Sequence, residues 1–424
     1  MKTVRINENI SLNLIGMDKL KTTTVGVYIH RPLNREEVSF NTVLPLVLKN
    51  SSVLCPGRDA TAKYLENLYG AALGSAVMKR GEDHVIYFDA ETIADCYAPN
   101  NEKLVSELLR LVMSVLFDTD AAKKGAFDEK LVEQEKKNTA DAIDAFVNDK
   151  RRYALWRCQQ ETARGTAFEI LSMGDKEGLE KINAKNLYQH YKSIITSSVI
   201  DIYICGKADI DKVEKTIREY TDNLSFSAAQ VPRTDIIERN ENDINTVTEE
   251  MDVTQGKLSI GFLTGIKPGD PDSYALTVFN SLFGAGAHSK LFNNVREKLS
   301  LAYYASSQLE RFKGMLTVNA GVEFENFQKA YDETLVQLEE IKKGNISEHE
   351  FNSSISAVIN TCRSYYDDQR ALASYYLTEK ISGRDVSLED YIENLQKVTV
   401  DEVAAVAKKI KLDTVYFLKG REGE

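Results

Sequence analysis

Residues 23–34 have the sequence TTVGVYIHRPLN, and residues 257–271 have the sequence KLSIGFLTGIKPGDP. In both segments apolar and polar residues alternate and then give way to a proline-containing loop, which is typical of a half-buried strand and its turn. Gly26 and Gly261 occupy matching places. An apolar helical pattern follows each segment, TVLPLVL in the first half of the chain and YALTVFNSLFG in the second. The sequence therefore indicates two copies of one unit.

The correspondence continues along both halves. Residues 63–91 and 293–323 each predict a helix, a strand, a turn containing Gly81 or Gly314, and a second alternating strand. Each half then continues with an amphipathic helix, a long charged helix, a short helix and a final strand. Strands in runs, separated by pairs of helices, do not give the strict alternation of a doubly wound fold. We expect an α+β fold in which each half is a mostly antiparallel sheet with helices packed on one face.

The length of the chain agrees with this division. A chain of 424 residues is too long for one ordinary core and favours two domains of about 200 residues each. Residues 223–250 are polar and contain the only proline between Pro99 and Pro268. We expect an N-terminal domain at 1–222, a linker at about 223–250 and a homologous C-terminal domain at 251–424.

Composition excludes several classes of protein. The net charge of −11, from 64 acidic and 53 basic residues, disfavours nucleic acid as a partner, because phosphate binding needs a basic face. No run of eighteen apolar residues predicts a membrane span, and the first residues lack the apolar core of a signal peptide. The five cysteines are scattered and form no CxxC pair. They fit reduced thiols, so we expect a cytoplasmic protein.

Residues 282–308, LFGAGAHSKLFNNVREKLSLAYYASSQ, carry a recognisable signature. They resemble the second-domain pattern of the insulinase/pitrilysin family of zinc metallopeptidases: a glycine-rich turn, an Arg-Glu-Lys sequence and a tyrosine seven residues after the arginine. Arg296 and Tyr303 have that spacing. With the tandem halves, the resemblance extends over nearly the whole chain. It implies the metallopeptidase fold of the LuxS and processing-peptidase type.

Catalytic members of this family carry an inverted zinc motif, H-x-x-E-H, on the first helix of the first domain. Two imidazoles on one helical turn hold Zn²⁺ there, a glutamate between them acts as general base, and a glutamate on the long charged helix completes the site. Residues 39–52, SFNTVLPLVLKNSS, stand in that place and contain neither histidine nor glutamate. The ligand positions fall on Thr42, Leu44, Leu46 and Leu48. The later helix keeps the acids Glu129, Glu133 and Glu135.

A carboxylate without its imidazoles does not hold zinc, so the resemblance implies no metal in this chain. Pro45 removes one backbone donor and is expected to bend or shorten the helix. His30 and His84 are the remaining candidates for a metal site in this half. Two histidines with no third ligand are weak evidence, and we interpret them as solvated residues at turns.

The resemblance also implies what the remaining signature does. In two-chain members such as the mitochondrial processing peptidase, one chain carries the zinc motif and the other, like its alpha subunit, lacks it. Arg296 is then expected to hold substrate carbonyls and Tyr303 to donate a hydrogen bond to the oxyanion, both at the partner's zinc. Gly284 and Gly286 stand where non-catalytic subunits have a substrate-contacting loop, and a plain turn is the equal alternative. His288 in that loop is expected to be solvated.

We therefore interpret the chain as the non-catalytic, substrate-binding or regulatory subunit of a two-chain zinc metallopeptidase acting on peptides. It is expected to be inactive alone and to form a heterodimer with a zinc-bearing paralogue, which supplies the zinc. Two alternatives stay open: a homodimeric peptide-binding or scaffold protein of the same fold, and an autonomous hydrolase with other ligands. In the structural alternative, Arg296 belongs to a surface charge cluster with Glu297 and Lys298, and Tyr303 is a packing aromatic. Tyr304 faces the opposite side of its strand.

Overall fold

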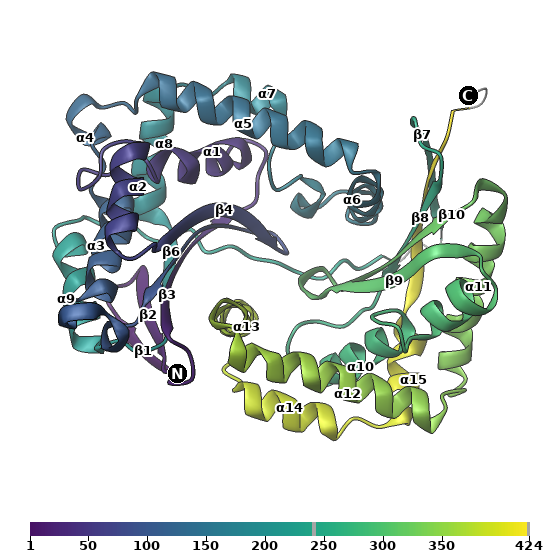
Figure 1. Ribbon diagram of the computed structural model, residues 1–424. Coiled ribbons are helices and arrows are strands. Elements are labelled where there is room, and N and C mark those ends of the chain that lie inside the picture. The colour runs from purple at the N-terminus through teal and green to yellow at the C-terminus, as the bar shows by residue number, and fades with distance from the viewer. Residues whose placement is uncertain (240–242, 422–424) are drawn as a thin grey trace. The chain divides into compact units, whose positions relative to one another are not determined.

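The computed structural model describes residues 1–239 and 243–421. Contacts divide the chain into two compact units (Figure 1). Unit 1 comprises Met1–Ile143, Ile170–Arg233 and Tyr366–Tyr375, and unit 2 comprises Asp144–Glu169, Thr234–Tyr365 and Tyr376–Glu424. Each unit therefore includes a segment from the other half of the chain, and the contact-based division does not follow the contiguous halves expected from the sequence.

Unit 1 contains a six-stranded sheet in the order β1-β2-β6-β3-β5-β4. Its central strand β3 is antiparallel to β5 and β6, whereas β2 is parallel to β6. The strands are β1 (Lys2–Arg5), β2 (Ile10–Ile15), β3 (Thr22–Pro32), β4 (Ala72–Arg80), β5 (Asp83–Ile93) and β6 (Val199–Cys205).

Unit 2 contains a five-stranded sheet in the order β7-β11-β8-β10-β9. Its central strand β8 is antiparallel to β10 and β11, and β7 is parallel to β11. The strands are β7 (Asn245–Glu250), β8 (Gly256–Leu263), β9 (Ala302–Glu310), β10 (Met315–Val322) and β11 (Lys411–Lys419). This pattern repeats that of unit 1 without β1, which confirms the tandem α+β organisation expected from the sequence.

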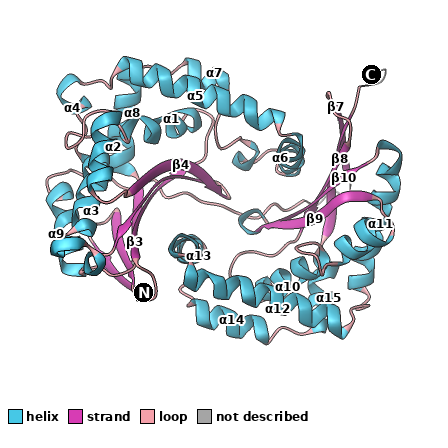
Figure 2. Ribbon diagram, viewed as in Figure 1, coloured by secondary structure: helices cyan, strands magenta, loops and turns pink. Residues whose placement is uncertain are grey.

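Apart from α13, the helices of unit 1 cover one face of its sheet (Figure 2). The residues Val25, Val27 and Ile29 alternate along β3 and belong to the core that this face forms with the helices. Helices that begin in unit 1 are α1 (Val38–Leu48), α2 (Arg58–Asn67), α3 (Leu104–Phe117), α4 (Ala121–Lys124), α5 (Glu129–Asn148), α7 (Lys176–Glu180), α8 (Ala184–Ser197), α9 (Ile210–Thr221) and α13 (Gln369–Ile381).

Near the start of α13, Arg370 forms ion pairs with two carboxylates of β5. Its Nε lies 2.5 Å from Asp89 Oδ2 and its Nη1 lies 2.7 Å from Glu91 Oε2. These contacts explain why residues from the second half of the chain belong to unit 1.

Unit 2 has helices on both faces of its sheet. Helix α6 (Lys150–Thr162) packs against β8, β10 and β11. It approaches β8 so closely that a Cβ at Gly261 would lie 2.1 Å from Thr162 Oγ1, so this strand position needs glycine. The other helices are α10 (Ser273–Phe283), the π-helix η4 (Leu291–Lys298), α11 (Phe327–Lys342), α12 (Glu348–Ser364), α14 (Leu388–Gln396) and α15 (Val400–Lys409).

The segment expected as a linker, residues 223–250, is only partly irregular. Residues 225–239 lack helix and strand, and residues 240–242 lie outside the described residues. The last six residues form β7, which pairs with β11. The alternation of exposed threonine and glutamate with half-buried residues in β7 is typical of an end strand, and it was hidden in the overall polarity of the segment.

Candidate functional site

Helix α1 (Val38–Leu48) is the helix on which the resemblance places the zinc motif of catalytic members. It is buried on nearly all sides, and Leu44 and Leu48 at the expected ligand positions are each 1% exposed in the core. The helix continues through Pro45 to Leu48, and Ser75 Oγ donates a hydrogen bond to the Pro45 carbonyl oxygen. This helix therefore serves the core of unit 1.

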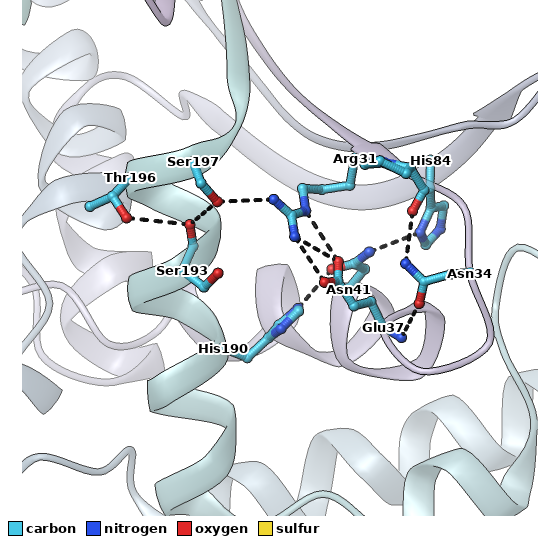
Figure 3. Close-up of polar contacts among 10 residues, drawn as sticks. Arg31, Asn34, Glu37, Asn41, His84, His190, Ser193, Thr196 and Ser197 are labelled. Atoms are coloured by element: carbon cyan, nitrogen blue, oxygen red, sulfur yellow. Dashed lines mark hydrogen bonds and ion pairs between the residues drawn. The ribbon is translucent and has the colours of Figure 1, made fainter. Parts of the chain in front are cut away.

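One turn of α1 carries a polar group, Asn41, that joins two histidines (Figure 3). Asn41 Nδ2 lies 3.2 Å from His84 Nδ1, and His190 Nε2 lies 2.8 Å from Asn41 Oδ1. The other nitrogen of His84 lies 3.0 Å from the Ser172 carbonyl oxygen. We call these four residues the Asn41 cluster. Because Asn41 Nδ2 can only donate, His84 accepts at Nδ1 and donates from Nε2.

Both histidines of the Asn41 cluster are neutral at pH 7. Burial lowers the pKa of His84 to about 4, more than its hydrogen bond to Ser172 raises it. Burial and the charge of Arg31 lower the pKa of His190 to about 4. Neutral imidazole is the form that binds metals. Here the amide of Asn41 is hydrogen-bonded to one ring nitrogen of each histidine. In the described residues no group of three or more His, Cys, Asp or Glu side chains has an arrangement suited to a metal ion.

The expectation that His30 and His84 are solvated was wrong. Both are buried, with exposed fractions of 3% and 0%. Strand β3 continues to Pro32, past His30, and His84 lies opposite Arg31 inside the β3–β5 ladder. The turn that precedes His84 lies between β4 and β5 at Gly81, where φ is 60°.

Asn41→Leu is expected to lower the free energy of unfolding by about 2–4 kcal/mol, because it leaves buried groups of His84 and His190 without partners. Asn41 is fully buried, whereas Asn67 is exposed and gives a matched control. Urea unfolding measures the difference. Equal midpoints for Asn41→Leu and Asn67→Leu would contradict the role of the cluster.

Chelation gives a second check. Because the Asn41 amide is hydrogen-bonded to both histidines, we expect EDTA to leave the thermal unfolding midpoint of the isolated chain unchanged. We also expect elemental analysis to find far less than one zinc per chain. A fall in the midpoint on chelation that added zinc reverses would show a structural metal.

Next to the Asn41 cluster, the buried Arg31 pairs with the half-buried Glu37. Arg31 has an exposed fraction of 0%, and its guanidinium binds both carboxylate oxygens of Glu37 at 2.8 and 2.9 Å through Nη2. Its Nη1 donates to Ser197 Oγ at 3.1 Å. These contacts connect β3, the start of α1 and the end of α8 (Figure 3).

His30 belongs to a separate buried group on the opposite face of β3 from the helix-facing core residues. Its Nδ1 lies 2.6 Å from Asp83 Oδ2, and its Nε2 lies 3.4 Å from Asp201 Oδ2. Ser11 Oγ donates to the other oxygen of Asp201. Burial lowers the pKa of His30, but the hydrogen bonds and charges of Asp201 and Asp83 outweigh it and raise the pKa to about 9. His30 is therefore an imidazolium between two carboxylates at pH 7.

Two of the acids named on α5, Glu133 and Glu135, have structural partners. Glu135 has an exposed fraction of 6%, pairs with Arg58 and accepts a hydrogen bond from Asn138 Nδ2 at 2.9 Å. Glu133 pairs with Lys136 at 2.8 Å.

The Arg-Glu-Lys signature lies in unusual backbone. Residues Leu291–Lys298 form a π-helix, and its end is marked by a hydrogen bond from the Leu299 nitrogen to the Asn294 carbonyl oxygen. Ser300 then adopts φ 51°, a left-handed conformation that is costly for a residue with a side chain. Both features are rare and are found disproportionately at functional sites. Arg296 lies in this π-helix, and Tyr303 follows Ser300 by three residues.

Arg296 and Tyr303 have exposed side chains with different partners. The Arg296 guanidinium lies over the Phe292 ring, 4.6 Å from its centroid, and Nε lies 3.4 Å from Glu297 Oε1. Tyr303 is 59% exposed on β9, and its hydroxyl donates to the Glu323 carboxylate. That hydrogen bond raises the pKa of Tyr303. The contact with Glu323 could not be predicted from residue types, because it depends on the register between β9 and β10.

The two glycines of the loop after α10 differ. Gly284 is buried, its carbonyl oxygen accepts from the Ser307 nitrogen at 3.0 Å, and a Cβ there would lie 2.6 Å from that nitrogen. Gly286 is exposed with φ 151°. His288 is half-buried, not solvated as expected, because its Nε2 bonds Ser281 Oγ at 3.0 Å and burial lowers its pKa. Gly284 thus holds the loop against β9, and Gly286 is the glycine accessible to a ligand.

Two units of repeated topology, with an apolar helix where catalytic relatives bind zinc, define a metallopeptidase fold without its metal site. A family model described as the peptidase M16 inactive domain matches residues 181–358. A Bacillus subtilis (strain 168) protein described as the probable inactive metalloprotease YmfF is 33% identical over 98% of this chain and 96% of its own. The chain belongs to the M16 peptidases, the insulinase/pitrilysin family, as a member without the zinc motif.

Other relatives agree with this family. A B. subtilis protein described as the uncharacterized zinc protease YmxG is 25% identical over 69% of each chain. A solved structure of a conserved protein from Enterococcus faecalis V583 has a TM-score of 0.90 and 28% identity, covering 100% of this chain and 99% of its own. A protease from Helicobacter pylori has a TM-score of 0.81 at 15% identity, covering 99% of each chain, and shares the fold.

Among the described helices, none combines the length and the apolar character needed to cross a membrane.

Proposed function

We propose that this chain is the non-catalytic, substrate-binding subunit of a two-chain zinc peptidase that acts on peptides in the cytoplasm. Its partner is a zinc-bearing paralogue, and the zinc belongs to that partner. The observation that carries the proposal is an asymmetry within the chain. The helix that carries the zinc motif in catalytic members is part of the core here, with Leu44 and Leu48 buried. Arg296 and Tyr303, in contrast, are exposed on either side of the left-handed Ser300.

Tyr303 is the group proposed to act in the reaction. Its hydroxyl has one proton to donate, and in the free chain it donates that proton to Glu323. When a metal-bound water attacks a peptide carbonyl, the negative charge that develops on the carbonyl oxygen competes for the same donor. Arg296 is proposed to hold a substrate carbonyl through its guanidinium, which Phe292 orients by stacking.

Substrate is proposed to bind as an extended strand, through main-chain hydrogen bonds at a sheet edge. Strand β9 supports this proposal because it is an end strand of its sheet and carries Tyr303. The loop at Gly284 meets this strand through the hydrogen bond from the Ser307 nitrogen to the Gly284 carbonyl oxygen. Gly286, exposed in the same loop, is the proposed substrate-contacting glycine.

The alternative is a scaffold or peptide-binding protein without a catalytic partner, formed by two copies of the chain. The hydrogen bond between Tyr303 and Glu323 favours it, because a tyrosine satisfied within its own chain has no need of substrate. Co-expression with each paralogue that carries H-x-x-E-H, followed by a peptide-cleavage assay, separates the two. The subunit proposal requires a pair that cleaves peptides faster than the paralogue alone. A chain that forms only homodimers and accelerates no cleavage would favour the scaffold.

A further inference from the structure

A group of cationic and aromatic side chains lies outside the proposed reaction site, on the face of the unit 2 sheet that carries α6. Tyr304, Gly321 and Lys257 are direct neighbours across β9, β10 and β8. A Cβ at Gly321 would lie 2.5 Å from Tyr304 Cε1 and 2.9 Å from Gln255 Oε1. The missing side chain at Gly321 therefore lets the Tyr304 ring lie across the strand.

Arg151, from the first turn of α6, covers the other side of that ring. Its guanidinium carbon is 4.1 Å from the centroid of Tyr304. Burial raises the pKa of Tyr304 to about 12, so the ring stays a neutral platform. Stacking of this kind orients a guanidinium and leaves its N–H edge free to bind a planar anion with two hydrogen bonds. Arg151 is exposed, so that edge is accessible.

Lys257 adds a second positive charge. It is half-buried, and its Nζ donates to Gln255 Oε1 at 2.6 Å, which directs the ammonium. Burial and the charge of Arg151 lower the pKa of Lys257. Within residues 1–239 and 243–421, neither Arg151 nor Lys257 forms an ion pair with a carboxylate. The neighbouring Asp149 caps α6, accepting from the Arg152 nitrogen at 3.1 Å.

Two cations that repel each other and are held in place by neutral groups are unusual in a chain with a net charge of −11. We infer that Arg151 and Lys257, arranged by Tyr304 and Gln255, form a binding site for a carboxylate of a peptide ligand. The carboxylate is either the C-terminus of the peptide or an acidic side chain. The inference rests on the proposed peptide-binding function and adds a preference for acidic ligands.

A peptide, rather than a nucleic acid, fits the surroundings. The site has two cations and not the extended basic face that a phosphate backbone needs. Tyr304 lies on β9, the end strand next to the site, so a peptide paired along β9 brings its side chains or its terminus to Arg151.

Fluorescence anisotropy with three labelled peptides tests the inference. All share one extended sequence without acidic residues: the first ends in a free carboxylate, the second in an amide, and the third in an amide with one internal glutamate. We expect the amide without glutamate to bind about tenfold or more weakly than at least one of the others, as loss of a charge-assisted pair implies. Tight binding of the first alone identifies the C-terminus, and tight binding of the third alone identifies a side chain.

The double variant Arg151→Gln/Lys257→Gln is expected to abolish that preference. The control Lys397→Gln/Lys408→Gln removes the same charge at the end of α14 and in α15, and it is expected to keep the preference. Equal binding of all three peptides to the wild type, or a preference that survives in the Arg151→Gln/Lys257→Gln variant, would overturn the inference while peptide binding stands.

A small carboxylate that does not depend on peptide binding distinguishes the proposed carboxylate site from the proposed peptide-binding function. N-acetylglycine is expected to shift the Arg151 Nε–H resonance in an NMR titration, and N-acetylglycinamide is expected not to. If this shift occurs but no peptide binds, the carboxylate site stands and the proposed peptide function fails. If neither compound moves the resonance, the carboxylate site is excluded.

Discussion

Tyr303→Phe is expected to lower kcat of the reconstituted pair by about 10²–10³-fold, as measured for loss of one preorganised oxyanion donor. The substitution removes only the phenolic oxygen. We therefore expect the aromatic ring at position 303 on β9, and the assembly with the partner chain, to be unchanged. KM and co-elution of the two chains are expected to stay near their wild-type values, because the lost hydrogen bond forms in the transition state. Steady-state kinetics at saturating partner measure both.

Tyr69→Phe is a matched control for this prediction. Tyr69 is 46% exposed and has a hydrogen bond to Glu102 that raises its pKa, much as Glu323 does for Tyr303. Glu323→Gln removes the competing carboxylate and is expected to keep the activity. Turnover by the Tyr303→Phe pair equal to that of the Tyr69→Phe pair would exclude the role of Tyr303 in trans.

His30→Gln is expected to lower the free energy of unfolding of the chain by about 3–5 kcal/mol, the range for breaking a buried ion pair. The variant leaves Asp83 and Asp201 buried, at 3% and 2% exposed, without the positive charge between them. His349→Gln is the control, since His349 is exposed. Urea unfolding at pH 6 measures the effect. A loss no larger than that of the control would contradict a stabilising ion pair at His30.

The pH dependence of stability gives the same group a second readout. The pKa of His30 is raised in the folded chain from 6.5 to about 9. A raised pKa means that the folded state holds the proton more tightly, so the stabilisation is fully present below pH 6.5 and is lost as the pH rises through 9. Wild type is expected to lose stability over this window, and His30→Gln is expected to lose less. Parallel profiles for the two proteins would contradict the pairing.

Much of the fold follows from local pattern in the sequence. Strand alternation in residues 23–34 and 257–271 predicted the central strands β3 and β8. The exchange of segments between the units was not predictable in this way. Helix α6 belongs to unit 2 because of its packing on β8 at Gly261, and the start of α13 belongs to unit 1 through Arg370. Such contacts join residues far apart in sequence.

The candidate site was predictable to a similar degree. The spacing of Arg296 and Tyr303 and the absence of the zinc motif are sequence facts. The hydrogen bond from Tyr303 to Glu323 and the left-handed conformation of Ser300 depend on backbone geometry, which the residue types do not predict. His30 was misread because it was placed at the turn that ends the first strand, whereas β3 continues through it to Pro32. Its carboxylate partners lie on two other strands, β5 and β6, and become neighbours only once the register is known.

The most direct test of the central claim is metal analysis and peptide cleavage by the complex that the tagged chain forms with its zinc-bearing paralogue. The account predicts a stoichiometric pair with one zinc, removed by mutating the H-x-x-E-H motif of the paralogue, and cleavage that needs both chains. Full activity of the paralogue alone, with no gain when this chain is added, would contradict it and leave Arg296 and Tyr303 with structural roles only.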